Sequence, residues 1–596
     1  MNMRMSLVLV FLLVPTAAFA APPADMEAVI EEYEADLNSV SRFYDLPWSV
    51  NRFDRLDRLQ HDWQGGLARV DFDQLDQHGR VDWLLLRAKT QSELDDQALD
   101  RRRLVEMAEL LPFRGGIQAL EEARWRLEPL DSAAAAARLS RIPDQIKQLR
   151  ERIDRGRKEA ATEKKPSARQ EKTPPKDTPP LKPSPSVALR AARAVESLRR
   201  SLRTWFTFYD GFTPDFSWWV RKPHEAADKA LEEYQKYLRE EIAGQHGEDD
   251  DPLVGDPVGE QGLKRLLAGE MIAYTPQEIV AIGERELAWC EAEMRQAARE
   301  MGFAENWKAA LARVKSSFVP PGEQDDLVAR QAREAIRFVK DRDLVTVPPL
   351  CEETWRLTMT SPESQKRMPY AAYAGQAMTV AYASESMKHD DKLMAMRGNN
   401  RHFTRIVTAH ELIPGHHLER FQSSRHRPYR QLFSTPFFIE GWGLYWEMRL
   451  WDLHYARTPE DRIGMLFWRM NRAARIIVSF KSHLGTMKPA EMVDFLVDRV
   501  GNEKFGATSE VRRYLEYSPL YQAAYMLGGL QLHALHKEVV GGGRMTEKAF
   551  HDAVLACHAI PVEMVRAEVL ELPLAREYQP RWRFAGPLPQ KRGTHP

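Results

Sequence analysis

The sequence TAHELIPGHHLE, residues 408–419, places His410 and Glu411 just before a proline–glycine step and a second pair of histidines. It nearly spells the His-Glu-x-x-His zinc motif, in which two histidines one helical turn apart bind the metal and the glutamate acts as general base. The fourth residue after His410, however, is Pro414. Whether these histidines can share a metal therefore depends on how the backbone bends at this step.

An unbroken helix would keep the two histidine pairs apart. At ~100° and ~1.5 Å per residue, His416 would lie about 240° around the axis and about 9 Å along it from His410, and His417 about 10.5 Å along it. Two nitrogens that are each ~2.0–2.1 Å from one zinc ion lie at most about 4 Å apart. Pro414 interrupts helical hydrogen bonding, and Gly415 tolerates a tight bend. We predict a bend that returns His416 to His410; His417 is the alternative, but the bend would then absorb three extra residues rather than two.

A candidate third ligand follows in the sequence TPFFIEGWGLYWE, residues 435–447. Catalytic zinc takes three protein ligands and keeps an open position. Glu440 stands among aromatic and aliphatic residues, where an unpaired carboxylate is costly to bury, and a metal would offset that cost. A pairing of Glu440 with an arginine is one alternative, and Glu447, two helical turns further on, is a rival ligand.

The chain as a whole has helical periodicity. Apolar residues from Met26 to Val40 recur at three- and four-residue steps, and Thr275 and Glu278 form a capping box at the start of another helix. The best strand signal is short, from Gln376 to Tyr382. We predict a mainly α, multi-helix fold with a small β element near the active site. The predicted divisions after residue 20 are an N-terminal helical region 21–154, a linker or insertion 155–186, a helical catalytic region 187–580 and a C-terminal tail 581–596.

The segment 155–186 differs sharply in composition from the rest. Its sequence, RGRKEAATEKKPSARQEKTPPKDTPPLKPSPS, is rich in Lys, Pro, Ser and Thr and nearly lacks large apolar residues. Such a segment buries too little apolar surface to offset the entropy of ordering the chain. A solvated tether between helices is the simpler interpretation, and its positive charge leaves a polyanion or membrane-surface role as the alternative.

The first twenty residues, MNMRMSLVLVFLLVPTAAFA, have the pattern of a secretory signal peptide. Arg4 supplies the positive region, an apolar run of about eight residues follows, and Ala18 and Ala20 form a cleavage signal. This run is much shorter than the ~20 residues of a membrane-spanning helix. We therefore expect cleavage before Ala21 and a periplasmic or secreted protein with no stable membrane span; an uncleaved anchor is the alternative.

Composition and the absence of certain motifs exclude several classes of protein and of functional site. Lys plus Arg total 85 and Asp plus Glu 86, giving a net charge of −1 that argues against a dedicated nucleic-acid binder. Three cysteines cannot build a disulfide framework or a four-thiolate zinc site. Neither a G-x-S-x-G nucleophile elbow nor a phosphate-binding P-loop is present. A metal in this protein must rely on histidine and carboxylate ligands.

Taken together, HELIPGHH and EGWGLYWE resemble the bacterial domain of unknown function 885 family, which is regarded as related to helical zinc metallopeptidases of the glutamate-ligand class. The resemblance implies a metallopeptidase-like fold, in which His410, His416 and Glu440 bind Zn²⁺ and Glu411 is the catalytic base. Further similar blocks are RAAR at 472–475, His483, EVRRY at 510–514 and PLYQAAYMLG at 519–528.

Two departures from the family pattern are visible. Family members often have Gln where this chain has Glu419, which leaves the implied ligands intact. They also have Asp-Thr-Gly before the later histidine, where this chain has Ser-Phe-Lys-Ser at 479–482. The second departure bears on how His483 is oriented and on which substrate it meets.

The predicted reaction is hydrolysis of a peptide bond in a peptide or peptide-like substrate. Its oxyanion needs a donor besides the metal, and Tyr525, His483 and Tyr514 are candidates, each also explicable as a buried structural residue. Arg475 or Arg513 could hold a substrate carboxylate, although an ion pair on a helix face is the simpler explanation for either arginine alone. Two other functions remain open: a metal-dependent hydrolase of a non-peptide amide or ester, and a catalytically silent helical binding protein.

Overall fold

The chain folds as a mainly α protein in this computed structural model. The predicted signal peptide, most of the predicted linker and the end of the C-terminal tail lie outside the described part of the chain. The residues that the structure describes are 25–163, 179–248, 251–365, 368, 370–375, 377–516 and 518–587.

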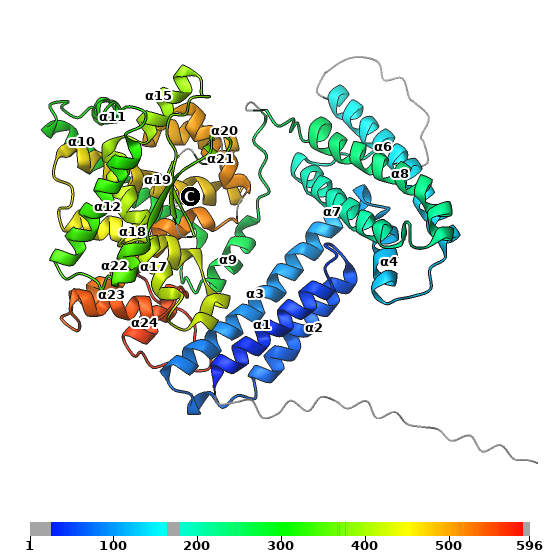
Figure 1. Ribbon diagram of the computed structural model, residues 1–596, viewed down its shortest axis with the longest axis horizontal. Coiled ribbons are helices and arrows are strands. Elements are labelled where there is room, and N and C mark those ends of the chain that lie inside the picture. The colour runs from blue at the N-terminus through cyan, green and yellow to red at the C-terminus, as the bar shows by residue number, and fades with distance from the viewer. Residues whose placement is uncertain are drawn as a thin grey trace, which may run out of the picture.

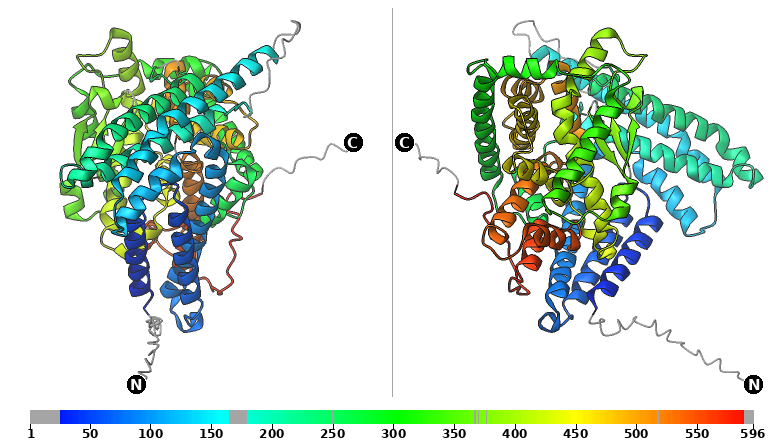
Figure 2. Two further views of the ribbon diagram at one scale, coloured as in Figure 1. Left: turned by 90° about the vertical axis from the view of Figure 1, so that its right-hand side faces the viewer. Right: turned by 60° about the vertical axis from the view of Figure 1, so that its left-hand side comes forward.

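Two large hydrophobic cores divide the described part of the fold, and a third, small cluster is formed by Val319, Tyr382 and Met396. The smaller of the two large cores is formed by the C-terminal part of α3 (Gln77–Met107) together with α4 (Arg114–Trp125), α5 (Ser132–Ser140), α6 (Ile142–Glu163), α7 (Pro185–Tyr209) and α8 (Pro214–Tyr237). The larger core joins α1 (Met26–Phe43), most of α2 (Val50–Leu67) and the start of α3 to the C-terminal half of the chain. Figure 1 shows α4 and α6–α8 as a lobe beside the larger body, and the right-hand view of Figure 2 shows that lobe projecting from it. The boundary between the cores thus falls within α3, inside the region 21–154 that the sequence treated as one unit.

The larger body contains the remaining elements. Its short helical turns are η1 (Phe72–Gln74), η4 (Pro428–Phe433) and η5 (Leu496–Val500), while η2 (Ala108–Leu110) and η3 (Leu238–Ile242) adjoin the smaller lobe. Its helices before the metal motif are α9 (Gly259–Gly269), α10 (Pro276–Glu300), α11 (Trp307–Lys315), α12 (Gln324–Asp341), α13 (Pro349–Thr354), α14 (Pro362–Gln365) and α15 (His389–Gly398). Its later helices are α16 (Arg401–Glu411), α17 (His416–Ser423), α18 (Pro436–Asp452), α19 (Pro459–His483), α20 (Pro489–Phe495), α21 (Lys504–Glu516), α22 (Tyr521–Val539), α23 (Glu547–Ala556) and α24 (Val562–Val569).

Local sequence explains the helix starts. Asp25 accepts from the backbone N–H of Glu27 at the start of α1, and the predicted capping box between Thr275 and Glu278 is present at the start of α10. Such caps satisfy backbone donors that a helix leaves unpaired at its N-terminus. All three cysteines are buried free thiols, and no helix in the described part of the chain is both long and apolar enough to cross a bilayer.

The predicted linker begins later than its composition suggests. Helix α6 continues through Glu163, nine residues into the segment 155–186, and α7 already begins at Pro185. The Lys, Glu and Ala residues at its start look disordered by composition but have high helix propensity, so they extend an established helix. Residues 164–178 lie outside the described part of the chain.

A three-stranded sheet is the small β element. Strand β3 (Ala377–Val380) lies within the predicted strand, whose first residue is outside the described part of the chain. It pairs in parallel with β1 (Arg356–Met359) and antiparallel with β2 (Ala372–Ala374), so the order is β1-β3-β2. The predicted mainly α, multi-helix fold with a small β element is confirmed, although the sequence did not reveal β1 and β2.

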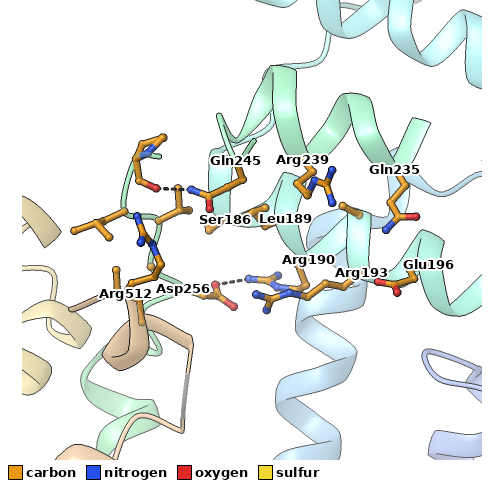
Figure 3. A pocket seen from close by; sticks show the side chains of 16 residues that line it. Ser186, Leu189, Arg190, Arg193, Glu196, Gln235, Arg239, Gln245, Asp256 and Arg512 are labelled. Atoms are coloured by element: carbon orange, nitrogen blue, oxygen red, sulfur yellow. Dashed lines mark hydrogen bonds and ion pairs between the residues drawn. The ribbon is translucent and has the colours of Figure 1, made fainter. Parts of the chain in front are cut away.

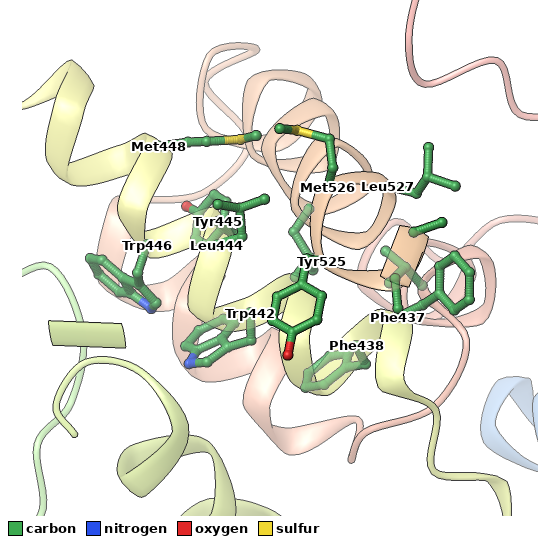
Figure 4. Packing of buried hydrophobic residues seen from close by; sticks show 14 of the residues in the cluster. Phe437, Phe438, Trp442, Leu444, Tyr445, Trp446, Met448, Tyr525, Met526 and Leu527 are labelled. Atoms are coloured by element: carbon green, nitrogen blue, oxygen red, sulfur yellow. The ribbon is translucent and has the colours of Figure 1, made fainter. Parts of the chain in front are cut away.

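Helices α18 and α22 pack so closely that their backbones touch. A Cβ on Gly441 would lie 2.7 Å from Cα of Gly528, and a Cβ on Gly528 would lie 1.8 Å from the carbonyl oxygen of Phe437. Figure 4 shows the aromatic side chains of α18 and Tyr525 of α22 in this packed layer. Only glycine allows this approach, and it brings residues of α22 to the metal motif carried by α16–α18.

Candidate metal centre

The helix breaks at the proline–glycine step, as the sequence predicts. Helix α16 ends at Glu411 and α17 begins at His416. Leu412 leaves helical angles, with φ −105° and ψ −113°, and the Ile413–Pro414 peptide bond is cis. The N–H of Gly415 donates to the carbonyl of Ala409 at 3.0 Å, which closes the bend on the end of α16.

Glycine is required at position 415. A Cβ there would stand 1.8 Å from the carbonyl oxygen of His410, inside any van der Waals contact. The bend is also fixed from outside, because Trp442 of α18 donates from Nε1 to the carbonyl of Pro414 at 2.9 Å. The four residues between the helices are therefore held by contacts on both sides.

This bend brings two imidazoles and a carboxylate together. The His410 and His416 rings have centroids 4.7 Å apart and planes at 90°. Glu440 Oε2 lies 3.4 Å from Nε2 of His416 and 3.8 Å from Nε2 of His410. Ligand distances of ~2.0–2.2 Å in a tetrahedral zinc site imply ligand atoms about 3.3–3.6 Å apart, so the spacing suits one cation. These three residues could hold a metal.

Glu411 borders the same space. Within the described residues, ligand atoms of His410, Glu411 and His416 all lie within 4.8 Å of one another. Two carboxylates are thus available as the third ligand. Glu440 is the better fit, since its other oxygen, Oε1, accepts a hydrogen bond from Tyr521 at 2.7 Å and Oε2 is left facing the two imidazoles.

His417 has a different set of partners from His416. Its Nε2 donates to the carbonyl of Cys351 at 3.0 Å, and its Nδ1 lies 3.1 Å from the hydroxyl of Tyr373 on β2. Both ring nitrogens are therefore engaged by protein groups. His417 joins α17 to the sheet, and His416 is the one that faces His410.

Glu447 lies behind His410. Its Oε1 is 2.8 Å from Nδ1 of His410, on the opposite edge of the ring from the nitrogen that faces Glu440. A carboxylate in this position fixes the tautomer and orientation of an imidazole ligand. The structure therefore gives Glu447 an orienting position rather than that of the rival ligand. Arg472 Nη2 lies 3.7 Å from the same oxygen.

The centre is rich in carboxylates, and the pKa values of its groups are shifted. Burial acts to raise the pKa of Glu440, but hydrogen bonds from His410 and His416 outweigh it and hold that pKa well below its usual range. Burial acts to lower the pKa of His410, yet Glu440 and Glu447 raise it to about 10. Burial raises the pKa of Glu411. Two buried carboxylates, Glu411 and Glu447, and the largely buried Glu440 surround two imidazoles and favour a positive charge between them.

Two tyrosines of α22 complete this side of the site. The hydroxyls of Tyr521 and Tyr525 are 3.4 Å apart, and Tyr521 donates to Glu440. The Tyr525 ring lies nearly parallel to that of His410, with centroids 6.4 Å apart. Burial, with the nearby Glu440 charge, raises the pKa of Tyr525 to about 12, so its hydroxyl keeps its proton at neutral pH. The sequence analysis missed Tyr521, although it stands one helical turn before Tyr525.

The other predicted residues separate into two groups. Tyr514 donates to Glu510, and Arg475 donates to both of these residues, at 3.0 Å to the Tyr514 hydroxyl and 2.9 Å to Glu510. The Arg475 guanidinium also lies 4.9 Å above the Tyr525 ring. Arg513 pairs with Glu510 at 2.8 Å and keeps 26% of its side chain exposed. This network adjoins the metal centre through Tyr525.

His483 lies elsewhere. Burial lowers its pKa to about 4, and its charged neighbours are Asp256 and Arg103 rather than Glu440 or Glu411. Eight residues of helix, about 12 Å, separate it from Arg475 on α19. The structure therefore does not bring His483 together with the other predicted catalytic residues.

A separate pocket of about 300 Å³ opens between α7, the segment 252–256 and α21. Its lining includes Arg190, Arg239 and Arg512, and Arg190 donates to Asp256 at 2.6 Å (Figure 3). No residue of the metal centre lines it. It lies between the smaller lobe and the larger body.

Solved structures share this fold. A protein of Shewanella oneidensis described as "a putative lipoprotein of unknown function" superposes with a TM-score of 0.65 at 16% identity, covering 92% of this chain and 100% of its own. A "putative lipoprotein" from Colwellia psychrerythraea gives 0.55 at 14% identity, covering 92% and 98%. A comparison with curated proteins finds no match. The model of the family described as "Bacterial protein of unknown function (DUF885)" matches residues 41–569, and the chain belongs to this family.

Proposed function

We propose that this protein is a zinc-dependent hydrolase that cleaves peptide bonds, with His410, His416 and Glu440 as metal ligands. The observation that carries the proposal is the convergence of two imidazole Nε2 atoms on one carboxylate oxygen, at 3.4 and 3.8 Å. Two histidines and one glutamate form a known donor set of catalytic zinc, which leaves a fourth position for water or substrate.

Independent features of the site fit a cation. Nε2 of His410 and Nε2 of His416 both face Oε2 of Glu440, and the two imidazole side chains are only 2% and 9% exposed. Glu447 lies behind His410, as acceptor groups behind metal-binding histidines usually do. When bound here, Zn²⁺ would supply Lewis acidity, which lowers the pKa of water and polarises a carbonyl.

The protein groups around the cation have distinct tasks in this proposal. Glu411 accepts a proton from the attacking water at its carboxylate and passes it to the departing amine nitrogen. Its burial and raised pKa suit a group that must both take and return a proton. Tyr525 donates its hydroxyl hydrogen to the developing oxyanion. Tyr521 positions Glu440 and lies within reach of the Tyr525 hydroxyl.

Of the two predicted substrate-binding arginines, Arg513 is the better candidate. Arg475 is 5% exposed and already donates to Tyr514 and Glu510. Arg513 keeps a quarter of its side chain exposed beside the same network, where it can hold a substrate carboxylate. A substrate with a free carboxylate near the cleaved bond would use this residue.

We also propose that the protein is exported. The predicted signal peptide supports this location, and the two structural neighbours described as putative lipoproteins are consistent with it. Export would place the centre in the periplasm or outside the cell, where peptides and peptide-like polymers are available as substrates.

Metal analysis and a peptide-library digest test the proposal together. We expect one zinc ion per chain in the purified mature protein and cleavage that a chelator abolishes and zinc restores. Glu411→Gln should retain the metal and lose cleavage by about 10²–10⁴-fold, the usual contribution of a general base. Glu419→Gln is the matched control, because Glu419 is a buried carboxyl on α17 that accepts from Ser423 at 2.7 Å.

Three results would contradict the proposal. Absence of stoichiometric zinc would leave a catalytically silent binding protein. Zinc with ester or non-peptide amide cleavage alone would replace the substrate class. Full turnover by Glu411→Gln would remove that residue from the role of base.

A further inference from the structure

The turn between α7 and α8 exposes a cluster of large aromatic side chains. Among the described residues, eleven large apolar side chains stand out as exposed, and four of them lie between residues 208 and 219. Trp218 is 84% exposed and Phe212 82%, with Phe208 and Trp219 about half exposed. We call these four residues the aromatic tip. Such a concentration on a short turn marks an interaction surface.

Other aromatic residues of the same turn hold it rigid from inside. Phe216 is fully buried, with its ring 5.0 Å from that of Trp205 and 5.1 Å from that of Tyr209. The N–H of Gly211, at φ 83°, donates to the hydroxyl of Ser217 at 3.0 Å. The turn therefore does not need the rings of Phe212 and Trp218 for its own packing, and Phe208 and Trp219 are only partly covered.

Basic residues surround the aromatic tip. Between residues 200 and 222 there are four basic side chains and two acidic ones, a net charge of +2. Arg203 and Arg221 are each more than half exposed although they pair with Asp228 and Asp210. Arg200 and Lys222 are also exposed, the latter one helical turn after Trp218. The Arg124 guanidinium lies 4.9 Å from the Phe208 ring. This charge is complementary to an anionic surface.

The combination of side chains points to a lipid surface. Trp and Phe prefer the boundary between headgroups and acyl chains, and Lys and Arg beside them reach the phosphate groups. The tip lies at the end of a helical hairpin in the lobe that projects from the body (Figure 2). None of its four residues lines the pocket beside α21 or the pocket between α4, α5 and the start of α6. A projecting rather than hollow surface suits insertion better than the capture of a peptide.

We propose that the aromatic tip inserts into the headgroup region of an anionic phospholipid membrane and holds the protein at its surface. The proposal is independent of the hydrolase activity, since no residue of the tip belongs to the metal centre. Insertion buries Phe212 and Trp218 shallowly, while Arg221 and Lys222 contact lipid phosphates. Binding of this kind is reversible, because only side chains enter the membrane.

Vesicle sedimentation of the mature protein tests this directly. We expect binding to vesicles of phosphatidylethanolamine and phosphatidylglycerol, weaker binding to pure phosphatidylcholine, and partial release by 0.5 M salt, about the range in which exposed charges are screened. The double variant Phe212→Ser/Trp218→Ser should lose at least about tenfold in partitioning. The control variant Val105→Ser/Leu350→Ser removes two exposed apolar side chains elsewhere and should bind like the parent.

A fluorescent probe distinguishes insertion from electrostatic adsorption. Because the three natural cysteines are buried, Trp218→Cys can be labelled selectively with an environment-sensitive dye. Anionic vesicles should shift its emission to the blue and leave a probe at Val105→Cys unchanged. Equal sedimentation of parent and tip variant, or an unshifted probe at residue 218, would overturn the proposal. Loss of a soluble protein or polysaccharide partner by the tip variant, with the probe unmoved by vesicles, would assign the surface to that partner instead.

Discussion

The backbone of Gly443 lies directly against the imidazole of His410. A Cβ at residue 443 would stand 2.5 Å from Cε1 and 2.8 Å from Nε2 of that ring. The ring is held between α18 and the bend that follows α16, so it has little room to move. We expect Gly443→Ala to displace His410 and to lower zinc affinity by about 10–100-fold, as misplacement of a ligand by its neighbours does.

Competition with a chromogenic chelator measures that change. Gly65→Ala is the control: Gly65 lies in α2 with nothing within 4 Å of the added methyl group, and alanine there should stabilise the helix by about 0.5–1 kcal/mol. Unchanged zinc affinity in Gly443→Ala would mean that His410 does not bind the metal in the orientation seen here.

Glu447 should control metal affinity without being a ligand. In Glu447→Gln the group 2.8 Å from Nδ1 of His410 loses its charge, so the imidazole becomes a weaker ligand. We expect zinc affinity to fall by about 10–100-fold, with one ion still bound per chain at saturation. His417→Ala should leave the stoichiometry and affinity of zinc nearly unchanged. Loss of zinc in His417→Ala, with zinc retained by His416→Ala, would reverse the assignment.

The two tyrosines of α22 should affect catalysis to different degrees. Tyr525→Phe removes the proposed oxyanion donor and should lower kcat by about 10²–10³-fold with little change in KM. Tyr521→Phe removes the hydrogen bond to Glu440 and should have the smaller effect, about tenfold. Steady-state kinetics on a peptide found by the library digest measure both. A larger loss in Tyr521→Phe than in Tyr525→Phe would exchange the two roles.

A buried ion cluster ties the N-terminal helices to the body. Arg430 is fully buried and donates to Asp82 of α3 at 2.7 Å, to Glu568 of α24 and to the carbonyl of Cys557 at 3.0 Å. Arg430→Met removes the buried cation between Asp82 and Glu568 and leaves Glu568 only the more distant Arg427, so we expect about 3–5 kcal/mol of destabilisation in urea unfolding. Arg101→Met, at an exposed pair with Asp54, should cost less than about 1 kcal/mol.

Acid should weaken the same cluster in a defined range. Burial acts to raise the pKa of Glu568, but hydrogen bonds from His78 and Arg430 lower it to about 2, against ~4.3 in an unfolded chain. Because the folded value is the lower one, this glutamate stabilises the fold fully above pH ~4.3, by on the order of 3 kcal/mol, and loses that effect as the pH falls towards about 2. The difference in unfolding free energy between the parent and Glu568→Gln should therefore become smaller between pH 4.5 and 2.5. A difference that stays constant over this range would contradict the lowered pKa of Glu568.

The sequence could predict whatever depends on local chemistry. Pro414 and Gly415 predict a helix break, because proline lacks a backbone N–H and glycine lacks a Cβ. The structure has the break at that step. Glu440 stood out because a carboxylate among aromatic residues needs a partner. These arguments need only a few neighbouring residues.

What the sequence could not predict depends on how helices pack. The position of Glu447 behind His410 follows from the rotation of α18, and the contact from Tyr521 to Glu440 follows from the close approach of α22. His483 matched a family block, yet its place on α19 directs it towards Asp256. Local composition was also misleading at residues 155–163, where charged helix formers extend α6.

Contacts between the two ends of the chain constrain when the protein can fold. Gln77 donates to the carbonyls of Ala567 and Leu572, and Arg87 donates to that of Tyr578, partners about 490 residues away. During synthesis, the apolar faces of α1–α3 stay exposed until almost the whole polypeptide has emerged, because the segments that cover them in the native fold are translated last. We therefore expect chaperones to protect this nascent N-terminal surface, because transiently exposed apolar surface is prone to aggregation.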